Sequence, residues 1–486
     1  MLRPFLHRLQ TPGVFPTAWL SALLALFATG CASTRHLSDA EDFYRTGQYQ
    51  VAAQVVSDAM PTEECKQERP KHVLDSLYLG SSEFMAGNFT AAESAFGHAI
   101  RGMDEQDKRT FNLGNDYQGT SYDAIMAGTY RALSLWMNGQ IDQARVAFRQ
   151  TAETQEHASD RNARLIQRMQ RQEQSQLRDS SNPEDVSATV RNTMRNGANA
   201  QTLALFQKDV NEWGSYDSFE NPASHFLDAV FALANREGPS DLEHGSFASR
   251  KALAMTPSIP AKNLFDLIEA LADRRVPSSE LDDVLIVVFE NGLGPTLIEK
   301  RFDLLIPVDN QYYYVGMALP QLLKRPEAYA GLVLTDGDKI LGSTRRICDF
   351  NRLVSTSYKQ ALPRLIAAEV LRCSLMVAVQ AVANEAAKEE YGEDTAVFVS
   401  LAGSLLAQST AKADTRMWKL LPNNYQASLS RKPTSGWLSI APSGNGRPIA
   451  QVAIPKKGLS VVYVKIPAPG LPPLCRLLGP RKASFQ

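Results

Sequence analysis

Histidine is missing from this 486-residue sequence beyond His244, which is the last of its seven histidines. A Ser-His-Asp or Cys-His catalytic site built within the second half is therefore excluded, although a lysine base remains possible. The zinc motif HExxH and the phosphate-binding motif GxxxxGKS/T are also missing. Asp336-Gly337-Asp338 lacks the further ligands of a calcium loop and is typical of a hairpin turn. The sequence thus predicts no catalytic residue, no metal site and no cofactor.

Cysteine is sparse, with five residues that are widely scattered and never spaced as CxxC. This spacing excludes a thioredoxin-type redox motif and a zinc knuckle. Besides Cys31, the cysteines are Cys65, Cys348, Cys373 and Cys475. Four cysteines in an exported protein allow three sets of disulfides, but buried free thiols are the simpler interpretation.

Neither an excess of one charge nor a long apolar run is present. The 51 basic and 52 acidic residues leave a formal net charge of −1, which gives no electrostatic basis for binding nucleic acid. A membrane span needs roughly 20 apolar residues. Residues 364–388 contain Glu369 and Arg372, and residues 396–408 are too few, so both segments are expected to be buried helices. The length predicts about two to four domains.

What is present begins with an export leader. Residues 1–30 contain Arg3 and Arg8, no acidic residue, and an apolar core from Ala18 to Phe27. The leader ends in Ala-Thr-Gly before Cys31, which resembles the lipobox of bacterial lipoprotein precursors. The resemblance implies cleavage before Cys31, lipidation of its thiol, and, with Ala32 next, an outer-membrane anchor facing the periplasm. An ordinary cleaved signal that happens to precede a cysteine is the alternative.

Three segments of the mature chain share one pattern. Each has an aromatic residue, a glycine three positions later, an apolar residue two beyond the glycine, and an alanine five beyond it. The aligned glycines are Gly47, Gly87 and Gly139. The glycine permits a tight turn and the alanine allows close approach of two helices, so each segment predicts an antiparallel helix pair. The pattern resembles the tetratricopeptide repeat, and we expect such an array over residues 31–152.

Residues 153–275 are expected to form a helical linker followed by a degenerate helix pair. The segment 153–179 has a narrow apolar stripe, typical of a long and mostly solvated helix, and Pro183 follows its end. The pair is predicted at 223–235 and 240–255, closed by Pro257 and Pro260.

Residues 276–466 are expected to form an α+β domain, because strand patterns surround two helices. Helices are predicted at 364–388, opened by Pro363, and at 396–408. Strands are predicted at 284–289, 311–317, 331–335, 338–341, 426–430, 436–440, 449–454 and 459–466. Residues 467–486 are expected to be a flexible tail. The fold class is therefore an α+β multidomain protein, with an N-terminal α-helical repeat array.

Three stretches resemble signature segments of an uncharacterised family of Gram-negative lipoproteins. They are Glu290-Asn291-Gly292, Glu299–Asp303 and Ala413–Pro422. The resemblance implies tetratricopeptide repeats in the first half and an α+β domain in the second. It implies a place in the cell envelope, and it supplies no activity.

Two sets of candidate site residues follow. The first would line a partner-binding groove on the inner face of the repeats, unless some of its members pack against inserted loops. It consists of Arg45, Ser81, Met85, Thr129, Leu133 and Met137. The second is a structural clasp, or alternatively a binding or acid–base site, in the second half. It consists of Glu290, Glu299, Arg301, Asp414, Arg416 and Trp418.

The sequence therefore predicts a lipid-anchored periplasmic scaffold that binds an unidentified envelope protein or peptide, in cell-wall synthesis or outer-membrane assembly. The first alternative is an envelope enzyme with its site in the α+β domain. The second is a subunit of an export or surface-filament apparatus.

Overall fold

The structure is a computed structural model that describes residues 35–60, 72–108, 116–180, 183–308, 311–391, 412–444 and 446–479. The predicted leader, the proposed lipidation site Cys31, Cys65 and the predicted helix 396–408 lie outside these ranges. Within them, no helix is both long and apolar enough to cross a membrane.

Three helix pairs form the N-terminal part of the chain, at the positions that the repeat pattern predicts. They are α3 (Arg35–Arg45) with α4 (Tyr49–Ala59), α5 (Val73–Ala86) with α6 (Phe89–Lys108), and α7 (Ser121–Met137) with α8 (Ile141–Glu156). The turn glycines Gly47, Gly87 and Gly139 have φ angles of 82°, 85° and 74°, which a side chain would strain. The alanine five residues beyond each glycine is fully buried, so the paired helices approach closely.

Six further helices complete the helical half. They are α9 (Ala158–Arg178), α10 (Pro183–Arg195), α11 (Gly197–Asn211), α12 (Pro222–Ala234), α13 (Pro239–Met255) and α14 (Ile259–Ala272). The predicted degenerate pair is present as α12 and α13, and α12 packs on α7 and α8. Pro260 does not close this pair, because it lies in the first turn of α14. A backbone N–H at that position has no partner within the helix, so proline, which lacks this group, is tolerated there.

Two sheets pack face to face in the second half. The larger has the strand order β11-β10-β1-β7-β6, and the smaller has the order β5-β4-β8-β9. The first comprises β1 (Val284–Asn291), β6 (Arg345–Asp349), β7 (Asn424–Arg431), β10 (Ser460–Ile466) and β11 (Leu474–Leu478). The second comprises β4 (Leu332–Asp336), β5 (Lys339–Ser343), β8 (Trp437–Pro442) and β9 (Ala450–Ala453).

The central strand β1 carries an apolar run, Val284 to Phe289, because both of its faces are covered. Ile286 and Val288 join a core shared with the helices, whereas Leu285, Val287 and Phe289 face the smaller sheet. The first of these cores contains residues from α3 through β11. The predicted repeat array and α+β domain are therefore joined by one continuous hydrophobic core.

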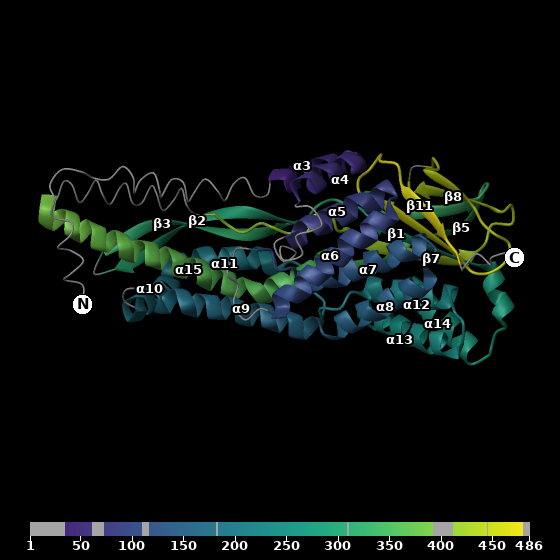
Figure 1. Ribbon diagram of the computed structural model, residues 1–486, viewed down its shortest axis with the longest axis horizontal. Helices are drawn as coiled ribbons and strands as arrows, with labels where there is room; N and C mark the ends of the chain where they lie inside the picture. Colours follow the sequence, from purple (N-terminus) through teal and green to yellow (C-terminus); the bar gives the residue numbers. More distant parts are fainter. Residues whose placement is uncertain are drawn as a thin grey trace.

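The remaining elements extend from this body as an arm at one end of an elongated molecule (Figure 1). The arm contains the two-stranded hairpin of β2 (Thr296–Val308) and β3 (Gln311–Leu323), together with α15 (Phe350–Tyr391). Helix α15 packs on β3, α9 and α10, and α11 packs on β2. Three segments thus build the arm together: α9 to α11 from the helical half, the hairpin between β1 and β4, and α15 between β6 and β7.

Four predictions about these elements were wrong or incomplete. Pro363 lies inside α15 rather than opening a helix, because packing on β3, α9 and α10 offsets the loss of one backbone hydrogen bond. The tail from residue 467 contains β11, which pairs with β10 and buries Leu474 and Leu478. Strands β2 and β6 were not predicted, and neither were α10, α11 and α14.

Candidate functional site

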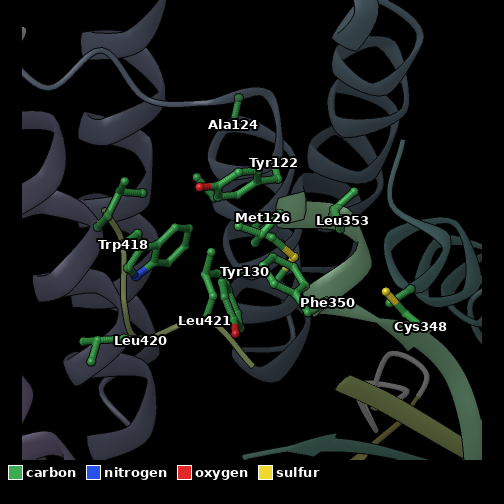
Figure 2. Packing of buried hydrophobic residues seen from close by; sticks show 14 of the residues in the cluster. Tyr122, Ala124, Met126, Tyr130, Cys348, Phe350, Leu353, Trp418, Leu420 and Leu421 are labelled. Carbon is green, nitrogen blue, oxygen red and sulfur yellow. The ribbon is translucent and has the colours of Figure 1, made fainter. Parts of the chain in front are cut away.

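The chain's own segment before β7 packs against helices α5, α6 and α7. Trp418 in this segment is 0% exposed, and its Nε1 donates a hydrogen bond of 2.8 Å to Ser81 Oγ on α5. Its ring centroid lies 5.8 Å from those of Phe96 and Tyr130. Figure 2 shows Trp418, with Leu420 further along the segment, beside the helix that carries Tyr130. An extended segment of the second half therefore lies where a peptide ligand was expected.

Most of the predicted groove residues are buried. Four of the six are buried in the folded chain, namely Ser81, Met85, Thr129 and Leu133. The Thr129 hydroxyl hydrogen-bonds Ser224 of α12 at 2.7 Å, so it lies in the contact between helix pairs. Arg45 is exposed and Met137 is half-buried. The predicted set is therefore not an open groove, because Trp418 covers Ser81 and helix α12 covers Thr129.

A buried polar cluster lies beside Trp418, where α7 meets the larger sheet. Glu290 of β1 forms an ion pair of 2.5 Å with Lys465 of β10. The hydroxyls of Tyr130, Tyr425 and Tyr463 all donate to the Glu290 carboxylate, from Tyr425 at 3.0 Å. Lys465 Nζ also donates to Tyr130 Oη at 2.8 Å and lies 4.4 Å from the centre of that ring. Both charges are thus fully partnered inside the core.

Burial controls the electrostatics of this cluster. It raises the pKa of Tyr130, Tyr425 and Tyr463 well above the ordinary value, and the nearby Glu290 carboxylate adds to that shift. It lowers the pKa of Lys465, and the Glu290 carboxylate opposes that shift. Removing one member of such a buried pair costs about 3–5 kcal/mol, because the other charge is left uncompensated. The chemical groups resemble those of an acid–base site, and here they join α7 to β1, β7 and β10.

The predicted clasp residues do not form one cluster. Glu290 belongs to the buried cluster, and Trp418 to the repeat face. Arg416 forms an ion pair of 2.7 Å with Asp414. The stretches Glu299–Asp303 and Ala413–Pro422 meet at Glu299, whose carboxylate accepts a 2.9 Å hydrogen bond from the Ala413 amide and pairs with Arg301 at 2.7 Å. The segment carrying Asp414 and Trp418 is not helical, so these two side chains do not share a helix face.

Sequence reasoning missed Lys465 and Arg325. Arg325 pairs with Glu41 of α3 at 3.0 Å and donates to the backbone carbonyls of Gly294 and Lys419. It therefore ties the first helix of the repeats to the segment carrying Trp418. A signal for Lys465 was present, because it is the single charged residue in the otherwise apolar strand 459–466. A charge in such a position requires a buried partner.

The thiols of the described cysteines are free. Cys348 and Cys373 are buried and Cys475 is half-buried. Burial raises the pKa of Cys348 and Cys373 to about 12, and that of Cys475 to about 11. Thiols with such pKa values are poor nucleophiles at neutral pH. Among the residues that the structure describes, no group of three histidine, cysteine, aspartate or glutamate side chains could hold a metal ion.

A search of protein-family models, curated proteins and solved structures found no match to this chain.

Proposed function

We propose that this protein is a lipid-anchored scaffold of the bacterial envelope, attached to the outer membrane through Cys31 and facing the periplasm. The lipobox supports the anchor, and helix α3 begins at Arg35, so that only positions 32–34 separate it from Cys31. This spacing leaves little room for a flexible stem. The helix pairs are proposed to be divergent tetratricopeptide repeats.

The repeats are proposed to act as a framework rather than as a receptor for a partner. The observation that carries this proposal is the insertion of Trp418 between Ser81, Phe96 and Tyr130. An external peptide would have to displace a fully buried tryptophan, and burial of a side chain of this size contributes about 3–5 kcal/mol. Hydrogen bonds of Tyr130 on α7 with Glu290 and Lys465 of the larger sheet support the same junction.

The arm is the better candidate for binding an envelope protein. Tyr312 and Tyr314 lie on one face of β3 and are 66% and 50% exposed. Exposed tyrosines combine apolar contact area with a hydrogen-bonding group, and they are enriched at protein interfaces. The outer edges of the hairpin are held by side chains, so these tyrosines are presented on a defined surface. Asn199 exchanges hydrogen bonds of 2.8 and 3.1 Å with Leu305 on β2, and Glu369 accepts from Ala318 on β3.

Site-specific crosslinking in living cells tests this proposal. A photoreactive amino acid would replace Tyr312 in one strain, the buried Tyr44 in a second, and the exposed Val146 of α8 in a third. We expect one envelope protein to be captured from the Tyr312 position, and not from Tyr44 or Val146. Equal capture from Tyr312 and Val146 would show that the arm has no special role. A fourth strain carries the photoreactive amino acid at Ser81, and capture of a partner there would restore the helix pairs as the receptor.

A further inference from the structure

The outward face of the smaller sheet carries a solvent-exposed tryptophan. Trp437 of β8 is 57% exposed, whereas the other tryptophans that the structure describes, Trp136, Trp213 and Trp418, are buried. Ile340 of β5 lies on the same sheet and is 69% exposed. The opposite face of this sheet packs on the larger sheet through residues such as Leu334 and Ile440. Trp437 therefore points away from the body of the protein.

Strand register places a row of uncharged polar side chains beside Trp437. Ile340 pairs with Thr335, Thr335 with Ser439, and Ser439 with Gln451, so one row crosses all four strands. The Gln451 amide donates to Ser439 Oγ at 3.3 Å, which places both side chains on this face. Three strand spacings of about 4.8 Å make the row about 14 Å long.

The rows on either side of this one are also uncharged. Trp437 pairs with Ala453 in the first, and Val333 pairs with Ala441 in the second. The face thus offers an indole ring, two hydroxyls and an amide, with no charged side chain among the paired positions of these three rows.

The loop before Trp437 is fixed in place. The Asp336 carboxylate accepts hydrogen bonds from the amide and hydroxyl of Thr434 at 2.7 and 2.8 Å, and also from Ser435. The Ser435 hydroxyl in turn accepts from the Trp437 amide at 3.2 Å. The hydroxyls of Ser435 and Thr434 lower the pKa of Asp336 to about 2, so the carboxylate keeps these contacts at envelope pH. The indole is therefore held on a rigid frame, which reduces the entropy lost on binding.

We propose that this face binds a neutral glycan chain, with one sugar ring stacked on Trp437 and neighbouring hydroxyls bound by Thr335, Ser439 and Gln451. The apolar C–H face of a sugar ring suits the electron-rich face of an indole. Sugar hydroxyls both donate and accept hydrogen bonds, as do the hydroxyls and the amide of the row. An uncharged face favours a neutral ligand, since no cation in these rows is placed to neutralise an anionic one. This binding site is independent of the scaffold function proposed above.

Other occupants fit the face less well. The core of a protein interface is more apolar than this surface, where the polar residues Thr335 and Ser439 lie between Ile340 and Trp437. The turn next to Ile340 carries Asp336, Asp338 and Lys339, so it offers no net positive charge to attract an anionic membrane surface. The titration described next includes probes for binding modes other than a neutral glycan.

Calorimetric titration of the purified full-length protein tests the proposal. The probes are cellohexaose and chitohexaose as neutral chains, polygalacturonate as an anionic chain, and phosphatidylglycerol vesicles as a membrane. We expect a neutral hexasaccharide to bind and Trp437→Ala to weaken its affinity about tenfold or more, because the stacked ring is lost. Trp437→Phe should retain part of the affinity, and Gln451→Ala should weaken it by a smaller factor.

Phe247→Ala, which removes a 50% exposed aromatic ring from helix α13, is the matched control and should bind as tightly as the parent protein. None of these side chains is buried, so circular dichroism should report unchanged folding. The proposal is wrong if neither neutral probe binds, if Trp437→Ala binds equally well, or if polygalacturonate or the vesicles bind more tightly than both neutral probes. Loss of crosslinking at the arm would leave this result unaffected, so the two proposals fail separately.

Discussion

Trp418 and Trp437 lie close together in the sequence and in opposite environments. Trp418 is enclosed by the repeat helices, where its indole N–H, the neighbouring rings and the charges of Glu290 and Lys465 all have partners. Trp437 lies on an outward sheet face, where hydroxyl and amide groups remain open to solvent. The comparison shows that a face of a helical array can be covered by the chain itself and need not bind a partner. The proposed binding site lies instead on a sheet face that solvent reaches.

The largest expected difference between the two regions is the effect of removing each indole. Trp418→Ala should lower the free energy of unfolding by about 4 kcal/mol, because it leaves a cavity between Phe96 and Tyr130. Trp437→Ala should change it by less than about 0.5 kcal/mol, because the ring is mostly exposed. Urea denaturation of both variants measures the two values. Similar losses in both variants would mean that Trp418 is not a core residue of the junction.

A buried and a half-buried carboxylate provide the second comparison. Glu290→Gln should destabilise the protein by about 3 kcal/mol, because Lys465 keeps its charge in the core without a counterion. Glu299→Gln, at the half-buried carboxylate that pairs with the exposed Arg301, should destabilise it by at most about 1 kcal/mol. Adding Lys465→Met to Glu290→Gln should recover most of the loss, since the unpaired charge is then removed.

That rescue distinguishes an ion pair from simple packing. If Lys465→Met makes the Glu290→Gln protein still less stable, the lysine contributes through its contact with the Tyr130 ring instead. The same denaturation experiment measures both outcomes.

Local patterns in the sequence predicted local structure well. The spacing of Gly47, Gly87 and Gly139 placed three helix pairs, because a tight turn needs a residue that adopts positive φ. The Asp336-Gly337 dipeptide placed the hairpin between β4 and β5 for the same reason.

Sequence patterns did not predict which distant segments of the chain pack together. Ser81 and Trp418 are 337 residues apart, and no periodic pattern indicates which distant segment covers a helix face. The apolar and small residues expected to line a groove are equally suited to receiving the chain's own tryptophan. Strand β2 was missed for the same reason. It contains several polar residues, and helices from elsewhere in the chain pack on it.

A smaller effect is expected at the glycines beside the junction. An alanine Cβ at Gly80 would lie 2.7 Å from the ring of Phe96, which is itself stacked on Tyr130 at 5.3 Å and cannot easily move. Gly80→Ala should therefore destabilise the protein by about 1–2 kcal/mol, although alanine is the better helix former. At Gly97, in the adjacent helix α6, the nearest atom is 3.3 Å away at the flexible end of Arg101. Gly97→Ala should therefore have the opposite sign and stabilise the protein by up to about 1 kcal/mol. Urea denaturation of the two variants measures this difference, and equal signs would contradict the close packing of Phe96 between the repeats and Trp418.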